Sequence, residues 1–330
     1  MQNLTDNRKG DKHMNTPVTS TNLSDGIIHL DAEYLQPGIA SVYLLIEGKQ
    51  CAIIETGTCH SVPCILSALA EFGLTTDSVQ YIIPTHVHLD HAGGVGLLMQ
   101  HCANAELVVH PFGARHMIDP TKLAAGAKSV YGDAAFKRLY GELIPVGADR
   151  VIEAPDNFEI NLGGRKLYFY DTPGHAKHHF CVHDSKSDTI FTGDTFGIAY
   201  PQANVDGEPL IFVTTTPVQF DPVTMQSSIE RLLSVKPKAF NLTHYGQVKP
   251  SKKVAEQLIN SIHAFVAIAN ESRDATHSRI DDMDAKIQQY LLEQYRMLGG
   301  TESDQFCRGI VAMDSKLNAQ GLDFWLSKQQ

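Results

Sequence analysis

The residues best suited to chemistry lie together in the segment Pro84-Thr85-His86-Val87-His88-Leu89-Asp90-His91-Ala92-Gly93-Gly94. Its three imidazoles and one carboxylate suit Zn²⁺, Mn²⁺ or Fe. In an extended chain the side chains of His86 and His88 project the same way, so both can bind one ion. Asp90 and His91 follow the bend and can reach a second ion. The alternative is a solvated histidine-rich loop, which the apolar run before the segment disfavours.

Three further candidate ligands follow later apolar runs. His175, Asp194 and His244 each stand just after a run of strand-like composition. Folds that alternate strands and helices gather their sites at the carboxyl ends of strands. Each residue alone would be weak support, since a lone histidine or aspartate in such a place is often structural. In this order after the segment 84–94, they predict one metal-binding site.

The ordered pattern resembles the metallo-beta-lactamase fold superfamily, and the resemblance spans about residues 25–250. It implies an α/β protein, a four-layer αβ/βα sandwich with the metals at one edge. It also implies which residues bind them: His86, His88 and His175 the first metal, Asp90, His91 and His244 the second, with Asp194 bridging the two. The implied cofactors are two divalent metal ions, Zn²⁺ first, with Fe or Mn open.

Two features place the pattern within this superfamily. The H-x-H-x-D-H form looks like the glyoxalase II and lactonase branches. The true β-lactamases typically have Cys or Ser in place of Asp194, and the flavodiiron oxygen reductases have Glu in place of His88, so both branches are disfavoured. The first family motif, usually Asp-x-Gly, here reads Glu55-Thr56-Gly57. We expect Glu55 to orient a ligand histidine or a backbone turn rather than to bind metal.

A site with two metals can hold a bridging hydroxide near neutral pH and polarise a carbonyl oxygen. Asp90 and Asp194 would be catalytic, accepting the proton and returning it. We therefore expect a metal-dependent hydrolase that acts on a small carbonyl ester-type substrate, a thioester or a lactone. Two alternatives stay open: a persulfide dioxygenase with a single iron, and a non-catalytic metal-bearing sensor whose helical tail binds a partner.

The composition argues against several other classes. The 330 residues include 27 Lys and Arg against 37 Asp and Glu, and the net charge of −10 disfavours nucleic acid or an anionic membrane as a partner. The polar N-terminus does not have the pattern of a signal peptide, and no run approaches the ~20 apolar residues of a membrane span. None of the six cysteines forms a C-x-x-C pair. We expect a cytoplasmic protein whose partner is a small-molecule substrate.

The elements that must position the site alternate between strands and helices. Residues 1–22 are expected to be a disordered leader and 23–250 the core domain, with a helical insertion at about 111–145 and a long apolar loop at 196–220. From 251 to 330 only helical periodicity remains, which predicts a helical extension. Its apolar positions are too many for a free surface helix, so we expect the core or a second copy, in a possible homodimer, to cover them. These positions are Ile262, Phe265, Ile287, Leu291 and Leu298.

Several residues near the site support weaker expectations. Tyr245 either donates a hydrogen bond to a substrate carbonyl or packs its ring and leaves the hydroxyl in solvent. His178 and His179 are expected at the surface or behind the ligands, although one of them could line the pocket. The insertion and the long loop could supply pocket walls, and their candidate residues are Tyr200, Phe212, Arg115 and Lys122.

Overall fold

Two β-sheets form the centre of the computed structural model, which describes residues 19–215, 218–275 and 278–329. The first sheet has the strand order β1 (Ser20–Ser24), β2 (Ile27–Asp31), β3 (Ser41–Glu47), β4 (Gln50–Ile54), β5 (Val79–Ile83), β6 (Glu106–Val109), β7 (Val151–Glu153). Its pairs are antiparallel from β1 to β4 and parallel from β4 to β7. The second has the order β13 (Gly246–Val248), β12 (Ala239–Leu242), β11 (Thr189–Phe191), β10 (Phe180–Asp184), β9 (Arg165–Asp171), β8 (Phe158–Leu162). Of its pairs, β11 with β12 is parallel and the others are antiparallel.

The alternation of side chains along the strands packs the two sheets face to face. In β3, Tyr43 and Leu45 join the apolar cluster between the sheets, to which Phe169 of β9 contributes from the other side. Val42 and Leu44 point the opposite way and pack against helices. Because both faces of such a strand are buried, its sequence is almost wholly apolar, as in the run 39–46, where Ser41 is the exception.

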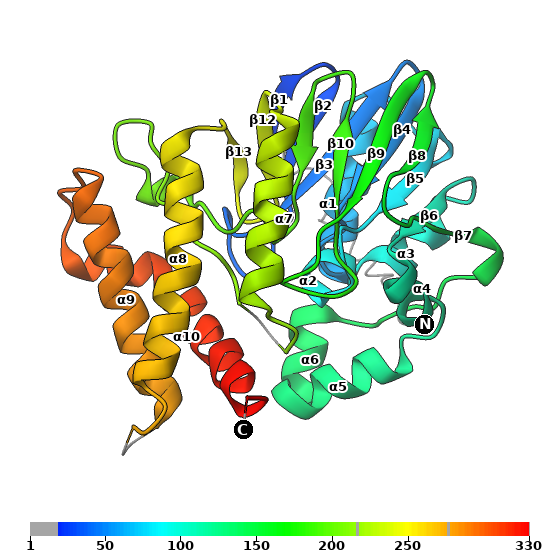
Figure 1. Ribbon diagram of the computed structural model, residues 1–330. Helices are drawn as coiled ribbons and strands as arrows, with labels where there is room; N and C mark the ends of the chain where they lie inside the picture. The colour runs from blue at the N-terminus through cyan, green and yellow to red at the C-terminus, as the bar shows by residue number, and fades with distance from the viewer. Residues whose placement is uncertain (1–18, 216–217, 276–277, 330) are drawn as a thin grey trace, which may run out of the picture.

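Helices cover the outer face of each sheet (Figure 1). On the first sheet pack α1 (Val62–Glu71), α3 (Val95–His101) and α4 (Pro111–Ile118). On the second lies α7 (Pro222–Val235), with α8 (Lys252–Glu271) packed beside it. The helices α9 (Arg279–Met297) and α10 (Asp304–Ser327) pack against α8 and against each other. The insertion adds α5 (Thr121–Tyr131) and α6 (Asp133–Tyr140), which pack beside the short helix α2 (Leu89–Ala92). The order helix, sheet, sheet, helix confirms the four-layer sandwich.

The helical extension packs onto the core of the same chain. Each of its helices begins at a serine cap, as Ser303 shows: its hydroxyl accepts a hydrogen bond from the Phe306 N–H at 3.2 Å. Of the apolar positions singled out in the sequence, Ile262, Phe265, Ile287 and Leu291 are buried in the cluster that α8, α9 and α10 share with the second sheet. The core therefore covers these positions, and the homodimer stays a prediction.

The expected boundary of the leader is too late in the sequence. Residues 1–18 lie outside the described residues, but Ser20–Ser24 forms β1 and pairs with β2. This strand lies at the edge of its sheet and is mostly exposed, so its polar sequence lacks the apolar alternation that marks the inner strands.

A buried ion pair links the second sheet to a turn of the first. Arg165, at the start of β9, donates from Nε and Nη2 to the two carboxylate oxygens of Asp184 at 2.7 and 2.5 Å. Its Nη1 donates to the carbonyl oxygen of Asp25, in the turn between β1 and β2, at 2.7 Å. Both charged side chains are fully buried, so each depends on the other to balance its charge.

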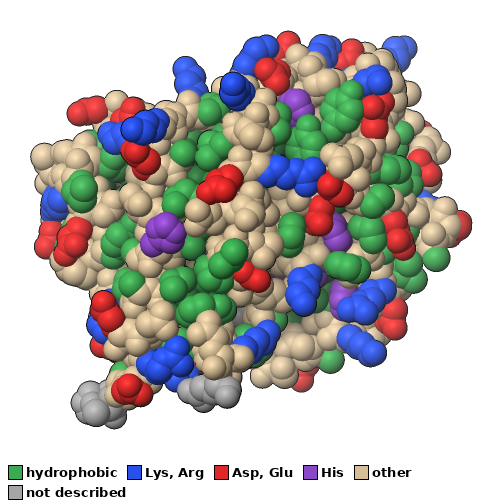
Figure 2. Space-filling view, viewed as in Figure 1, with side chains coloured by type: hydrophobic (Ala, Val, Ile, Leu, Met, Phe, Trp, Pro, Cys, Tyr) green, Lys and Arg blue, Asp and Glu red, His purple; other side chains and the backbone are tan. Residues whose placement is uncertain are grey.

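Two further properties concern the outside of the molecule. No helix within the described residues is long and apolar enough to cross a membrane. On the face shown in Figure 2, basic and acidic side chains are interspersed rather than gathered into areas of one sign.

Candidate metal centre

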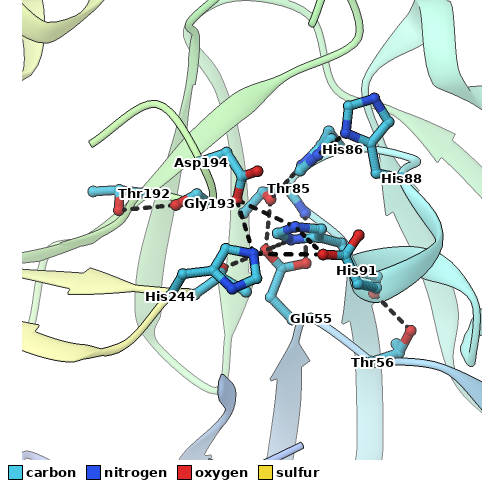
Figure 3. A network of polar contacts seen from close by, with 12 residues as sticks. Glu55, Thr56, Thr85, His86, His88, His91, Thr192, Gly193, Asp194 and His244 are labelled. Carbon is cyan, nitrogen blue, oxygen red and sulfur yellow. Dashed lines mark hydrogen bonds and ion pairs between the residues drawn. The ribbon is translucent and has the colours of Figure 1, made fainter. Parts of the chain in front are cut away.

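The structure brings all seven candidate ligands together at one edge of the two sheets. Figure 3 labels five of them: His86, His88, His91, Asp194 and His244. Each comes from a segment that follows a strand. The ligand segment 84–94 leaves β5 and includes α2, while later loops leave β9, β11 and β12. Strands that end at the same edge thus place residues from distant parts of the sequence side by side. The seven residues are His86, His88, Asp90, His91, His175, Asp194 and His244.

The donor atoms of these residues form two groups. In the first, one donor atom from each of His86, His88, His175 and Asp194 lies within 4.8 Å of the others, and the second joins Asp90, His91 and His244 in the same way. In the first group, Nδ1 of His88 lies 2.7 Å from Nε2 of His86 and 3.0 Å from Nε2 of His175. Three ring nitrogens therefore converge on one point.

The chemistry of this cluster fits divalent metal ions. Burial lowers the pKa of His86 and His88 well below the ordinary value, so both rings are neutral. Converging neutral imidazoles present lone pairs to one another, an arrangement that a cation stabilises. Nε2 of His91 and Oδ1 of Asp194 have no hydrogen-bond partner among the described residues, although they lie 3.2 Å apart. A metal ion would satisfy both atoms.

Asp194 lies between the two groups. Its Oδ2 is 3.3 Å from Nε2 of His175, and its Oδ1 is 3.2 Å from Nε2 of His91 and 3.5 Å from Nε2 of His244. The backbone N–H of Asp194 donates to Nε2 of His179 at 3.1 Å, which holds the aspartate from behind. One carboxylate oxygen thus faces each group, as a bridging ligand requires.

Glu55 supports the second group without belonging to it. The residue follows β4 with a φ of 64°, in the left-handed region that non-glycine residues seldom adopt. Its Oε1 accepts hydrogen bonds from Nδ1–H of His91 at 3.0 Å and from the hydroxyls of Thr85 and Thr243 at 2.5 and 2.9 Å. Its Oε2 accepts from the Thr85 N–H at 3.1 Å. The carboxylate therefore fixes the ring of His91 and ties together three segments (Figure 3).

The second group has more negative charge around its histidines than the first. Burial alone would lower the pKa of His91, but the carboxylates of Asp194, Asp90 and Glu55 raise it well above the ordinary value. Burial is likewise outweighed at His244, where Asp194 and Asp90 raise the pKa to about 9. The carboxylates thus favour positive charge at this point, whether from protons or from a metal ion.

A narrow cavity opens beside the second group. Asp90, Asp194 and His244 form part of its wall, and the loop 196–220 contributes Tyr200. The helix α10 supplies another part through Met313, Asp314 and Leu317. The helical extension therefore reaches the candidate metal centre.

Asp314 is a site residue that the sequence did not reveal. Its side chain is buried, with 6% of the residue exposed. The Tyr200 hydroxyl donates to its Oδ1 at 3.3 Å, whereas its Oδ2 has no hydrogen-bond partner among the described residues. Burial raises the pKa of Asp314 to about 6.

The weaker expectations have mixed outcomes. Tyr200 lines the cavity, whereas Phe212 is buried in the apolar core, and Arg115 and Lys122 are absent from the cavity wall. Tyr245 does not line it either, because its hydroxyl donates to Asp31 at 3.2 Å and its ring packs edge-on against His29.

His178 and His179 lie behind the ligands. Both are buried, and neither is at the surface. The ring of His178 stacks on that of His86 with centroids 6.1 Å apart. Nδ1 of His179 lies 2.9 Å from the Thr172 hydroxyl, which leaves Nε2 free to accept from Asp194.

Comparison with known proteins gives the same assignment as the geometry. Residues 35–244 match the family model described as the metallo-beta-lactamase superfamily. The metallo-beta-lactamase fold-containing protein ST1585 of Sulfurisphaera tokodaii is 32% identical over 225 residues, which cover 67% of this chain and 77% of that protein. Its solved structure aligns with a TM-score of 0.61 at 26% identity, over 91% of this chain and 99% of that one.

Two relatives with named activities are more distant. The acyl-coenzyme A thioesterase MBLAC2 of Bos taurus is 26% identical over 200 residues, covering 57% of this chain and 68% of that protein. An N-acyl homoserine lactonase of Bacillus thuringiensis is 26% identical over 187 residues, covering 55% of this chain and 61% of that protein. The family match spans the ligand-bearing core, and we conclude that this chain belongs to the metallo-beta-lactamase superfamily.

Proposed function

We propose that the protein is a hydrolase that uses two divalent metal ions to cleave a carbonyl ester-type bond, in a thioester or a lactone. The main support is the presence of two complete donor groups joined by Asp194. A persulfide dioxygenase with one iron would need only the first group, so the complete second group favours a dinuclear hydrolase. A thioesterase and a lactonase among the relatives agree with the reaction class.

The proposed ions are Zn²⁺, with Fe or Mn as alternatives, because imidazole and carboxylate donors suit all three. Such ions acidify a bound water and polarise a substrate oxygen. The protein's part is to orient the donors. Nδ1–H of His91 donates to Glu55, and Nδ1–H of His244 donates to the carbonyl oxygen of Ile39 at 2.7 Å. Each bond leaves Nε2 directed at the carboxylates of the site, as a metal-ligating tautomer requires.

Asp90 and Asp194 are the proposed acid–base groups. Burial alone would raise the pKa of Asp90, but His91 and His244 lower it below the ordinary value. At Asp194 burial would likewise raise the pKa, but the neighbouring histidines, His91 first, lower it well below the ordinary value. Both carboxylates are therefore ionised, and their place at the donor groups is the reason to assign them the acceptance of the proton from the attacking water and its return to the leaving group.

The test begins with metal analysis of protein purified without chelator, for which we expect two ions per chain. The same protein should then hydrolyse members of a panel of lactones and thioesters, and have little activity on a phosphodiester. Chelation should abolish turnover, and the metal should restore it. One ion or none would contradict the dinuclear site. If the fully metal-loaded protein hydrolysed no ester of the panel, the proposed hydrolase activity would be wrong and a metal-bearing sensor would be favoured.

A further inference from the structure

We propose that Asp314 recognises the substrate by accepting a hydrogen bond from an N–H or O–H group beside the scissile carbonyl. The site would therefore prefer uncharged or cationic substrates to anionic ones. This inference rests on the proposed hydrolase function and narrows its substrate class. It assigns a role to α10, which contributes none of the candidate metal ligands.

The position of Asp314 is the first support. The residue lies in the wall of the same cavity as Asp90, Asp194 and His244. One of its oxygens is bound by Tyr200, and the other has no partner among the described residues. A buried carboxylate oxygen without a donor is costly, and native proteins rarely contain one without a reason. The terminal torsion of an aspartate is broad, so the carboxylate can turn its free oxygen to a ligand while Tyr200 holds the other.

Asp314 is not explained as a further metal ligand. The donor atoms that converge within 4.8 Å of one another include Asp90 and Asp194 but no atom of Asp314. Its neighbours on the same helix face, Met313 and Leu317, are apolar and also line the cavity. The carboxylate is therefore the polar group of the part of the wall that α10 supplies, and ligand sites use such single polar groups to fix orientation.

The charge of the cavity gives the second support. Its wall contains three aspartates and one histidine, and no lysine or arginine among the described residues. A more open groove shares Ile39 and Tyr200 with the cavity and is lined by glutamines, apolar residues and a glycine, again without a charged residue among those described. An anionic substrate, such as a thioester of a phosphate-bearing thiol, would find no lysine or arginine side chain here to pair with its phosphate, and the proposed metal ions would be engaged by the scissile carbonyl. An uncharged substrate with a donor group fits both surfaces.

The experiment uses the metal-loaded full chain and two lactones of the same shape. In α-acetamido-γ-butyrolactone an N–H stands beside the carbonyl, and in α-acetoxy-γ-butyrolactone an oxygen replaces it. A hydrogen bond to a charged acceptor should make kcat/KM about ten- to a hundredfold higher for the acetamido compound, mainly through KM. The wild type should also cleave S-acetyl-N-acetylcysteamine, which is uncharged, more efficiently than acetyl-coenzyme A.

Asp314→Ala should bring the two lactones to within about threefold of each other without changing the metal content. Asp314→Asn, which keeps a neutral acceptor oxygen, should give an intermediate ratio. Asp304→Ala is the matched control: it alters an exposed aspartate in the first turn of the same helix and should leave activity and preference unchanged. Three results would overturn the inference. Asp314→Ala could keep the preference for the acetamido lactone, or it could lose kcat/KM equally for both lactones. The wild type could also cleave acetyl-coenzyme A more efficiently than S-acetyl-N-acetylcysteamine.

A binding measurement separates this inference from the hydrolase proposal. The corresponding γ-lactams, 3-acetamido- and 3-acetoxy-2-pyrrolidinone, are titrated into the metal-loaded protein by calorimetry. Tighter binding of the acetamido lactam, lost in Asp314→Ala, supports recognition even if neither lactone is hydrolysed, in which case only the proposed reaction fails. Equal binding of the two lactams, or no binding of either, overturns recognition by Asp314.

Discussion

Replacing Glu55 by glutamine should weaken the second metal-binding group and leave the first intact. The carboxylate accepts four hydrogen bonds, three at Oε1 and one at Oε2. Glutamine has one oxygen. If that oxygen keeps the bonds from His91, Thr243 and the Thr85 hydroxyl, its amide NH₂ must face the Thr85 N–H, which is another donor. One buried N–H then lacks a partner, at a cost of about 1–3 kcal/mol in the free energy of unfolding.

The same change removes the negative charge that supports the ring of His91. Loss of a hydrogen-bonded carboxylate behind a ligand histidine typically lowers metal affinity about 10–100-fold. We expect that loss at the group of Asp90, His91 and His244 only, because His91 is the one candidate ligand that Glu55 hydrogen-bonds among the described residues.

The assay is competition with a chelator, which gives the two metal affinities separately, combined with thermal unfolding of the metal-free protein. Glu106→Gln, the same chemical change at an exposed position at the start of β6, is the control and should alter neither quantity. If Glu55→Gln binds both ions as the wild type does, or loses both equally, the orienting role assigned to Glu55 is wrong.

Three other changes have definite expected outcomes. Asp194→Ala should lower turnover far more than Glu55→Ala, because Asp194 faces both donor groups; steady-state kinetics with parallel metal analysis would show it, and equal losses would refute it. Arg165→Met should cost about 3–5 kcal/mol of stability by chemical unfolding, because it leaves Asp184 buried and unpaired, and no measurable loss would contradict this. Burial would raise the pKa of Asp184, but contacts led by the hydrogen bond from Arg165 lower it below the unfolded value near 3.8. The stability that the ionised Asp184 contributes should therefore be present above that value and be lost as the pH falls through the lower folded pKa, and acid titrations should show a smaller loss for Arg165→Met. Truncation after Lys249 should keep every candidate ligand yet lower solubility and alter KM, and a soluble truncated protein with unchanged kinetics would refute the role of the extension.

The metal centre could be predicted because each ligand stands next to a local signal. His86 follows a short apolar run bounded by Pro84, and Asp194 and His244 follow runs that the structure shows as β11 and β12. Strand ends determine where such residues meet, and strand ends are visible in the sequence. The four-layer sandwich follows from the same signals, since strands that are apolar on both faces need a layer on each side.

Asp314 could not be found in this way. It lies between Met313 and Ser315 in a long amphipathic helix, where a lone aspartate has the pattern of a solvated face. Its place at the cavity results from the packing of α10 against the loop that contains Tyr200, a contact between segments far apart in the sequence. The burial of His179 beneath Asp194 has the same kind of origin. Its ring lies between the backbone N–H of Asp194 and the hydroxyls of Thr172 and Thr195, contacts that arise only when the chain folds.

The wall supplied by α10 also sets an order of assembly. A ribosome makes the chain from its N-terminus, and domains generally fold as they emerge. Every candidate ligand, from His86 to His244, is therefore synthesised before Asp314. During that interval the edge of the sandwich lacks the wall that α10 provides, and ions can reach the donors from that side. The helix α10 then supplies the wall that contains Asp314, so the residue proposed to select the substrate is synthesised after all the residues proposed to bind the metals.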